Sequence, residues 1–392
     1  MLREAARALL ISVVVAGCTA PTPSDAPNGN DPSAAPPDPA LVTQYRSAGL
    51  SLFANENAGA ALVSVAPDPT DTTSLATVSM VTFPSATTAR QRERDIAGLL
   101  VEPAQGTLHP GVVMLGEQTD SRDMLSRALD LANVGVVSLL VDPELAQLTF
   151  TPTDQYAVIQ QVLDLRSGLS ALANRSDVDE NATGFIGLGT GATIGGLFVG
   201  VESRLEASVL QSGSGSLADR LSSSPTGSSS PSLDPTALAA WTAAMQPVEP
   251  IWFVGNAPNP VLFQAGRQDT ITTPVESATF GKAGNAASSF SWYDAGHGLD
   301  DAASCDAAKF LSQYLGFEGR QLTACGAAPP QSNDTLSWLA IIGLFFLFVG
   351  VRLWVRLRRR PPGPPPAPPT PQEIAEEANA GRPVIRPAQP LR

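Results

Sequence analysis

Short apolar runs alternate along the chain with segments in which apolar residues recur at helical spacing, between residues 42 and 316. Each run predicts a buried strand, because it is too short for a buried helix and is bounded by turn-forming residues. Strands that alternate with helices are typical of an α/β fold with a mainly parallel, doubly wound sheet. The runs that predict strands are residues 96–101, 111–115, 136–141, 183–186, 205–210, 260–266 and 289–296.

Two segments between these runs and one after the last run have the spacing of helices that pack one face against a sheet. The first lies near residues 121–132, where Asp120 or Ser121 can cap its start and Gly135 ends it. The last is predicted over residues 300–315. The longest carries a stripe of apolar residues spaced by three and four, namely Val158, Val162, Leu165, Leu169 and Leu172.

The N-terminal end has the pattern of an export signal. Arg3 and Arg7 precede a short apolar run, which predicts a signal peptide over residues 1–17. The run ends in Val-Ala-Gly-Cys and resembles a bacterial lipobox, which implies that Cys18 is lipidated. An ordinary cleaved signal with an incidental cysteine is the alternative. Residues 18–40 are rich in Pro and polar residues and predict a flexible tether to a domain over residues 41–325.

The C-terminal end predicts one transmembrane helix over residues 335–356, after a linker at residues 326–334. The run LSWLAIIGLFFLFVGV is uncharged, and with its flank it reaches the roughly 20 residues that a spanning helix needs. Asp334 precedes it and an arginine cluster follows it, so the positive-inside rule predicts a domain outside the cell membrane and a cytoplasmic tail over residues 357–392. The proline-rich part of that tail is either a ligand for a cytoplasmic partner or a stiff spacer.

The net charge and the cysteine content limit the classes of binding partner and indicate the redox compartment. The net charge of −13 argues against binding to nucleic acid or to anionic lipid headgroups. With Cys18 assigned to a lipid, Cys305 and Cys325 remain as an even pair in an oxidising compartment, which predicts a disulfide; two free buried thiols are the alternative. We expect no cofactor and no metal ion.

The stretch GFIGLGTGATIGG, residues 184–196, has the layout of a nucleophile elbow. A predicted strand enters a Gly-rich turn and continues as a helix of small residues. In the pattern G-x-S-x-G the middle residue is the nucleophile. Here that position is Gly189, which has no side chain. The next residue, Thr190, carries a hydroxyl, but one residue further along the turn a side chain points in another direction.

Two further segments complete the arrangement. Asp269 follows a predicted strand in AGRQDTITTP, and His297 follows the last predicted strand in DAGHGLDD. In the order elbow, acid, histidine, the three segments resemble the α/β-hydrolase fold over residues 90–316, most closely its dienelactone-hydrolase-like branch. The resemblance implies that Asp269 and His297 hold the catalytic acid and base positions, that Thr190 offers a backbone N–H to an oxyanion, and that Gly189 is a degenerate nucleophile position.

Glu117 is the candidate that keeps catalysis possible. It follows the strand at 111–115, where the same branch is similar in having a glutamate near the nucleophile. Glu117 could face His297 and hold a water for attack on an acyl or lactone carbon. The alternative is a solvated loop carboxylate. Ser214 or Ser216 could also supply a nucleophile.

Residues 212–250 form a Ser/Pro-rich insertion where this fold often has a lid. Within it, Trp241 and Met245 are four residues apart on a short predicted helix that begins at Pro235. That spacing fits either a cap over the pocket or core packing.

Three functional hypotheses follow. The main one is a membrane-anchored, exported protein that has lost serine catalysis and binds an acyl- or lactone-like small molecule or a partner. The alternative is an active ester or lactone hydrolase that uses His297, Asp269 and Glu117 with water or another nucleophile. The third is a structural surface protein. Turnover separates the first two, and a rise in melting temperature on adding ligand separates the first from the third.

Overall fold

The computed structural model describes residues 34–54, 59–86, 94–117, 121–142, 150–223 and 234–317, together with Cys325. Contacts divide the chain into two units, Met1–Pro329 and Pro330–Arg392, and the described residues all belong to the first. The predicted signal peptide, Cys18, the linker, the transmembrane helix at 335–356 and the tail lie outside the described residues. Among the helices that are described, none is both long and apolar enough to cross a bilayer.

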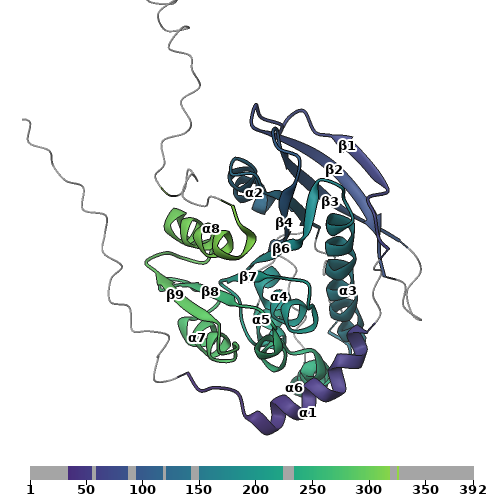
Figure 1. Ribbon diagram of the computed structural model, residues 1–392. Helices are drawn as coiled ribbons and strands as arrows, with labels where there is room; N and C mark the ends of the chain where they lie inside the picture. Colours follow the sequence, from purple (N-terminus) through teal and green to yellow (C-terminus); the bar gives the residue numbers. More distant parts are fainter. Residues whose placement is uncertain are drawn as a thin grey trace, which may run out of the picture. The chain divides into compact units, whose positions relative to one another are not determined.

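A nine-stranded sheet forms the centre of this domain, in the order β1-β2-β3-β5-β4-β6-β7-β8-β9 (Figure 1). The pairings β4–β5, β4–β6, β6–β7, β7–β8 and β8–β9 are parallel, as is typical of a sheet covered by helices on both faces. The pairings β1–β2, β2–β3 and β3–β5 are antiparallel. The strands are β1 Ser64–Pro67, β2 Ala76–Pro84, β3 Asp95–Pro103, β4 His109–Leu115, β5 Val137–Val141, β6 Val178–Leu188, β7 Ala207–Gln211, β8 Val261–Gly266 and β9 Ser289–Tyr293.

Helices cover both faces of the sheet, and each face has its own hydrophobic core. Helices α2 and α8 contribute Leu131 and Leu311 to one core, while α3, α4 and α7 contribute Leu165, Leu197 and Phe280 to the other. The helices are α1 Pro39–Gly49, α2 Leu125–Ala132, α3 Asp154–Ala173, α4 Thr190–Val201, α5 Leu217–Ser223, α6 Pro235–Met245, α7 Pro274–Lys282 and α8 Asp301–Leu315, with 3-10 turns η1 Leu50–Phe53, η2 Ser121–Met124, η3 Gln246–Val248, η4 Pro250–Trp252 and η5 Val254–Asn256.

The mainly parallel sheet and the helices α2, α3 and α8 agree with the sequence pattern. Three features differ. The predicted tether is too long, because Asp38 caps a helix and Pro39 begins α1. Strands β1 and β2 were both missed; the residues of β1 are exposed, and among the described strands it pairs with β2.

The side chains of Trp241 and Met245 in α6 are fully buried in the core beside α3. Trp241 Nε1 donates a hydrogen bond to Asp154 Oδ2 at 2.9 Å. A buried indole N–H usually needs such a partner. Trp241 and Met245 therefore pack the core and do not cap a pocket.

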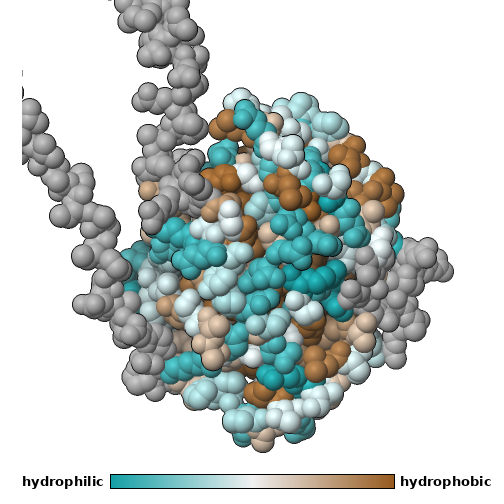
Figure 2. Space-filling model, in the orientation of Figure 1, coloured by the Kyte–Doolittle hydropathy of each residue, from teal (hydrophilic) through white to brown (hydrophobic). Residues whose placement is uncertain are grey.

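The surface seen in Figure 2 mixes polar and hydrophobic residues, with hydrophobic residues gathered over β1 and β2. Val63, Val65 and Met80 in this region are 63%, 53% and 49% exposed. Helix α8 packs against β6, β7 and β8, and its Cys305 lies against Cys325 with Cα atoms 4.9 Å apart. This separation lies in the range of protein disulfides, so the predicted pairing is geometrically feasible.

Candidate active site

Gly189 joins β6 to α4 in a sharp turn, with φ of 58° and ψ of −116°. L-residues hold such a conformation at a cost of about 1–3 kcal/mol, which glycine avoids. The Gly189 N–H donates to the Gln211 carbonyl at 2.8 Å, and its own carbonyl accepts from the Thr193 N–H at 3.0 Å, which begins α4. The turn therefore has the shape of a nucleophile elbow, with no side chain at its tip.

Asp269 and His297 come together from the ends of β8 and β9. His297 Nδ1 lies 2.8 Å from Asp269 Oδ2, and Asp269 Oδ1 accepts from the N–H groups of Ile271 and Thr272 at 2.8 and 3.0 Å. Burial acts to raise the pKa of Asp269, but the hydrogen bonds from His297 and the two N–H groups outweigh it and hold that pKa below its ordinary value. Asp269 is thus an ionised, fixed acceptor for the imidazole, as in hydrolytic acid–base pairs.

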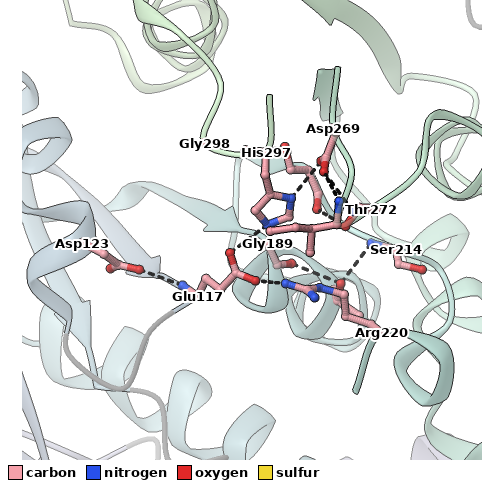
Figure 3. A network of polar contacts seen from close by, with 12 residues as sticks. Glu117, Asp123, Gly189, Ser214, Arg220, Asp269, Thr272, His297 and Gly298 are labelled. Atoms are coloured by element: carbon pink, nitrogen blue, oxygen red, sulfur yellow. Dashed lines mark hydrogen bonds and ion pairs between the residues drawn. The ribbon is translucent and has the colours of Figure 1, made fainter. Parts of the chain in front are cut away.

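Glu117 fills the space beside Gly189 (Figure 3). Its Oε2 lies 2.7 Å from His297 Nε2, and its side chain is only 20% exposed. A Cβ atom at residue 189 would lie 2.7 Å from Glu117 Cδ and 2.9 Å from His297 Nε2, closer than real Cβ contacts allow. The carboxylate therefore occupies the space of a serine side chain, and the alternative of a solvated loop carboxylate is wrong.

Arg220 of α5 completes the cluster, and sequence reasoning missed it. Its Nη2 contacts Glu117 Oε1, and the residue is 2% exposed. Burial lowers the pKa of Arg220, against the opposing charges of Asp269 and Glu276, but a guanidinium titrates so far above neutral pH that it stays charged. No motif marked this residue, because a single arginine in a serine-rich segment has no characteristic spacing.

The charges of Glu117, Asp269, His297 and Arg220 cancel in one protonation state of the histidine. Carboxylates only accept hydrogen bonds, so His297 donates to Asp269 and Glu117 together when both ring nitrogens carry protons. In that state His297 and Arg220 supply two positive charges against two negative ones. Buried charges are tolerated when they are paired in this way.

Asp123 holds the loop that carries Glu117, because its Oδ2 accepts from the Glu117 N–H at 2.9 Å. In α/β hydrolases a backbone N–H of this loop normally joins the oxyanion hole. Here the Glu117 N–H has another partner. Thr190 begins α4, so its N–H is among the first-turn donors that lack an intrahelical partner and can serve an oxyanion.

The hydroxyl groups proposed as alternative nucleophiles have other roles. Ser214 Oγ accepts from the Ser216 N–H at 3.1 Å, and Ser216 Oγ accepts from the Asp219 N–H at 3.2 Å. Both hydroxyls therefore cap the turn that leads into α5. Within the described part of the chain, His297 Nε2 contacts Glu117 and not Ser214, Ser216 or the Thr190 side chain. The same ranges contain no group of three or more His, Cys, Asp or Glu residues that could hold a metal ion.

No protein-family model matches this chain, and none of the curated proteins matches its sequence. Solved structures do match its fold. Acetyl xylan esterase 1 from Thermoanaerobacterium sp. JW/SL YS485 matches with a TM-score of 0.56 and 14% identity, over 72% of this chain and 96% of that one. An acetyl xylan esterase from Paenibacillus sp. R4 matches with a TM-score of 0.54 and 15% identity, over 71% and 95%.

A structure from Klebsiella pneumoniae subsp. pneumoniae MGH 78578, described as a dienelactone hydrolase, matches with a TM-score of 0.44 and 15% identity, over 62% of this chain and 98% of that one. Likeness at such low identity establishes a fold and not an activity. The two acetyl xylan esterase structures, with TM-scores above 0.5, show that the chain has the α/β-hydrolase fold, and the predicted mainly parallel sheet is confirmed. The transmembrane helix that was predicted with it lies outside the described residues. The branch within that fold stays a prediction.

Proposed function

We propose that this protein hydrolyses carboxylic esters or lactones with water as the nucleophile, through Glu117, His297 and Asp269. The supporting observation is that the Glu117 carboxylate occupies the space of the missing serine, 2.7 Å from an imidazole that Asp269 orients. Apolar residues in place of buried ion pairs are often neutral or stabilising, so stability alone does not require this cluster. Clusters of ionisable groups in such surroundings are concentrated at functional sites.

In the proposed reaction Glu117 is the general base and His297 the general acid. An acyl substrate enters between them, and a water bound to Glu117 Oε2 attacks the carbonyl carbon while it gives a proton to that carboxylate. Arg220 and the Thr190 N–H stabilise the tetrahedral oxyanion. His297 donates its Nε2 proton to the leaving oxygen as the C–O bond breaks, and Glu117 then returns its proton to His297. Ester and water become acid and alcohol, and the site regains its starting charges.

The choice of first substrates follows from the fold. Two structures of similar fold are described as acetyl xylan esterases, which supports acetyl and other short acyl esters as the first class to test.

The test is hydrolysis of p-nitrophenyl acetate, longer acyl esters and a lactone by the native protein, Glu117→Gln and His297→Ala. We expect native turnover and a loss of about a hundredfold or more in each variant. Glu180→Gln makes the same chemical change at an exposed position near the start of β6 and should have native activity. Because no serine is acylated, a fluorophosphonate should leave the native activity intact.

Single-turnover hydrolysis in H₂¹⁸O tests the role of water. Direct attack by water puts the label in the released acid only. Label in the Glu117 carboxyl group would instead reveal an acyl anhydride with Glu117 and would contradict the general-base mechanism. Absence of turnover with the whole panel would contradict the hydrolase proposal itself.

A second candidate is ligand binding without catalysis, and the closed contact of Glu117 with Arg220 and His297 favours it. In that case the native protein is inactive, yet a non-hydrolysable ester analogue raises its melting temperature.

We also propose that the domain lies outside the cell membrane, held by a lipid on Cys18 and by a helix at 335–356. The support is the sequence pattern at the two ends of the chain. Radiolabelled palmitate should enter the native protein and not Cys18→Ala.

A further inference from the structure

The turn that carries His297, residues 296–299, has little packing of its own. A Cβ atom added at Gly296 or Gly298 would meet nothing within 4 Å, and Leu299 has a positive φ of 58°. Loops with few contacts open and move more readily than packed elements. His297 therefore depends on contacts from outside the turn to keep its ring between the two carboxylates.

Ser212, directly after β7, contacts both loops of the site. Its Oγ donates to the His297 carbonyl at 2.7 Å, and its own carbonyl accepts from Thr272 Oγ1 at 3.0 Å. The Thr272 N–H in turn binds Asp269 Oδ1 at 3.0 Å. The Ser212 N–H donates to the Gln264 carbonyl of β8 at 2.8 Å. The polar groups of Ser212 thus join the histidine turn, the acid loop and the sheet.

The backbone of Ser212 is unusual for a serine. It is fully buried and has a positive φ of 52°. A residue other than glycine holds this conformation only where its surroundings impose it, and such residues are concentrated at functional sites. Glycine would adopt the same conformation freely but would lose the hydroxyl that binds His297. The hydroxyl contact is therefore the feature that distinguishes serine from glycine here.

We propose that Ser212 is a positioning residue whose hydroxyl fixes the His297 turn while its carbonyl fixes the Asp269 loop. Ser212 thereby sets the distance between the His297 turn and the Asp269 loop, so that the imidazole contacts both Asp269 and Glu117. Arg127 of α2 holds the next carbonyl of the turn, because its Nη2 donates to Gly298 at 2.8 Å. The effect of Ser212 on turnover rests on the proposed hydrolase function, whereas its effect on the His297 ring does not.

The chain offers a spectroscopic test, because His109 and His297 are its two histidines. His109 lies at the start of β4, at the other end of the strand from Glu117, and its Nδ1 is 2.8 Å from the Gly135 carbonyl. In ¹⁵N-histidine-labelled full-length protein, His109 is an internal reference. We expect Ser212→Ala and Ser212→Gly to raise water exchange of the His297 Nδ1 proton at least fivefold and to leave His109 unchanged.

The two variants separate the hydroxyl from the backbone. Alanine removes the hydroxyl and keeps the strained conformation, whereas glycine removes both and relaxes the backbone, so it also provides a folded variant if alanine does not fold. An equal increase in His297 Nδ1 exchange in both variants supports the proposal. An increase in Ser212→Ala alone would assign the faster exchange to backbone strain, and native exchange rates in both variants would show that the hydroxyl has no effect. Either of these two results would overturn the proposal. Ser208→Ala, at a buried serine of β7, the strand that leads to Ser212, is the matched control.

Kinetics give the second measurement. If misplacement of the general acid is the cause, kcat for an acyl ester should fall about tenfold with KM nearly unchanged. A native protein without turnover would contradict the hydrolase proposal, and the exchange measurement would still decide the role of Ser212.

Discussion

At the scale of single residues, Gly189 and Glu117 depend on each other. The missing side chain at residue 189 is what leaves room for the Glu117 carboxylate against His297. A substitution at either position therefore changes which side chain fits at the other. Residues that share space in this way show strongly non-additive mutational effects.

Restoring the serine should accordingly need two substitutions. Gly189→Ser alone places an L-residue at a positive φ, at a cost of about 1–3 kcal/mol, and adds a side chain that collides with Glu117. We expect it to lower the melting temperature and to react poorly with a fluorophosphonate. Gly189→Ser combined with Glu117→Ala should recover part of the stability and become labelled. The same pair with His297→Ala is the control, and efficient labelling of Gly189→Ser alone would contradict the prediction.

At the scale of elements, the seven-residue helix α5 controls whether Arg220 reaches the site. So short a helix is not stable by itself in water. Its first turn is held by Glu249, which is 2% exposed and accepts hydrogen bonds from the N–H groups of Leu217 and Ala218.

Stability should depend on pH through Glu249. Burial raises the pKa of Glu249 to about 7, although the two backbone hydrogen bonds act to lower it. The unfolded chain loses this proton near its ordinary pKa of 4.5, so between about 4.5 and 7 the unfolded state binds fewer protons and the free energy of unfolding falls as pH rises. Glu249→Gln should flatten this part of the curve in urea denaturation, and Glu180→Gln should not. Parallel curves for Glu249→Gln and the native protein would contradict the assignment.

Helix α7 begins just after the Asp269 loop with a capping box. Thr273 Oγ1 accepts from the Glu276 N–H at 3.3 Å, and Glu276 accepts from the Thr273 N–H at 2.7 Å. Thr273→Ala should lower the free energy of unfolding by about 1 kcal/mol in urea denaturation. Thr279→Ala, at a partly exposed position of the same helix, is the control, and equal stability of the two variants would contradict a capping role.

At the scale of the whole molecule, the elements that could be predicted are those that carry their own signal. Strand β5 is buried at all five positions, so its apolar run is visible in the sequence. The four residues of strand β1 are all exposed, and the strand is held by its pairing with β2. No apolar pattern in the sequence therefore marks it.

The residues of the site also divide into those that a local motif indicates and those that only the fold brings together. Gly189, Asp269 and His297 lie in short turns at strand ends, where local motifs indicate them. The sequence allowed two positions for Glu117, one facing His297 and one in solvent, and it did not indicate Arg220. Both are fixed by a contact between segments that are far apart in the chain, and no local pattern contains that information.

The link between Cys305 and Cys325 gives a prediction for the whole domain. The two residues are 20 positions apart, and a loop of that length corresponds to about 3 kcal/mol in the chain-entropy model. A reductant should therefore lower the melting temperature of the native protein and leave that of Cys305→Ala/Cys325→Ala unchanged. An unchanged native melting temperature would show that the disulfide does not form.

The contact of Glu117 with Arg220 and His297 also means that the chain places a carboxylate of its own against the Arg220 guanidinium and the His297 imidazole. A tethered group acts at an effective concentration of the order of millimolar, so any free carboxylate competes with it at a disadvantage. The acid released by hydrolysis should then be a weak product inhibitor, whereas an uncharged ester escapes this competition. Truncating Glu117 to alanine would leave Arg220 and His297 free to bind acetate or formate in place of that carboxylate.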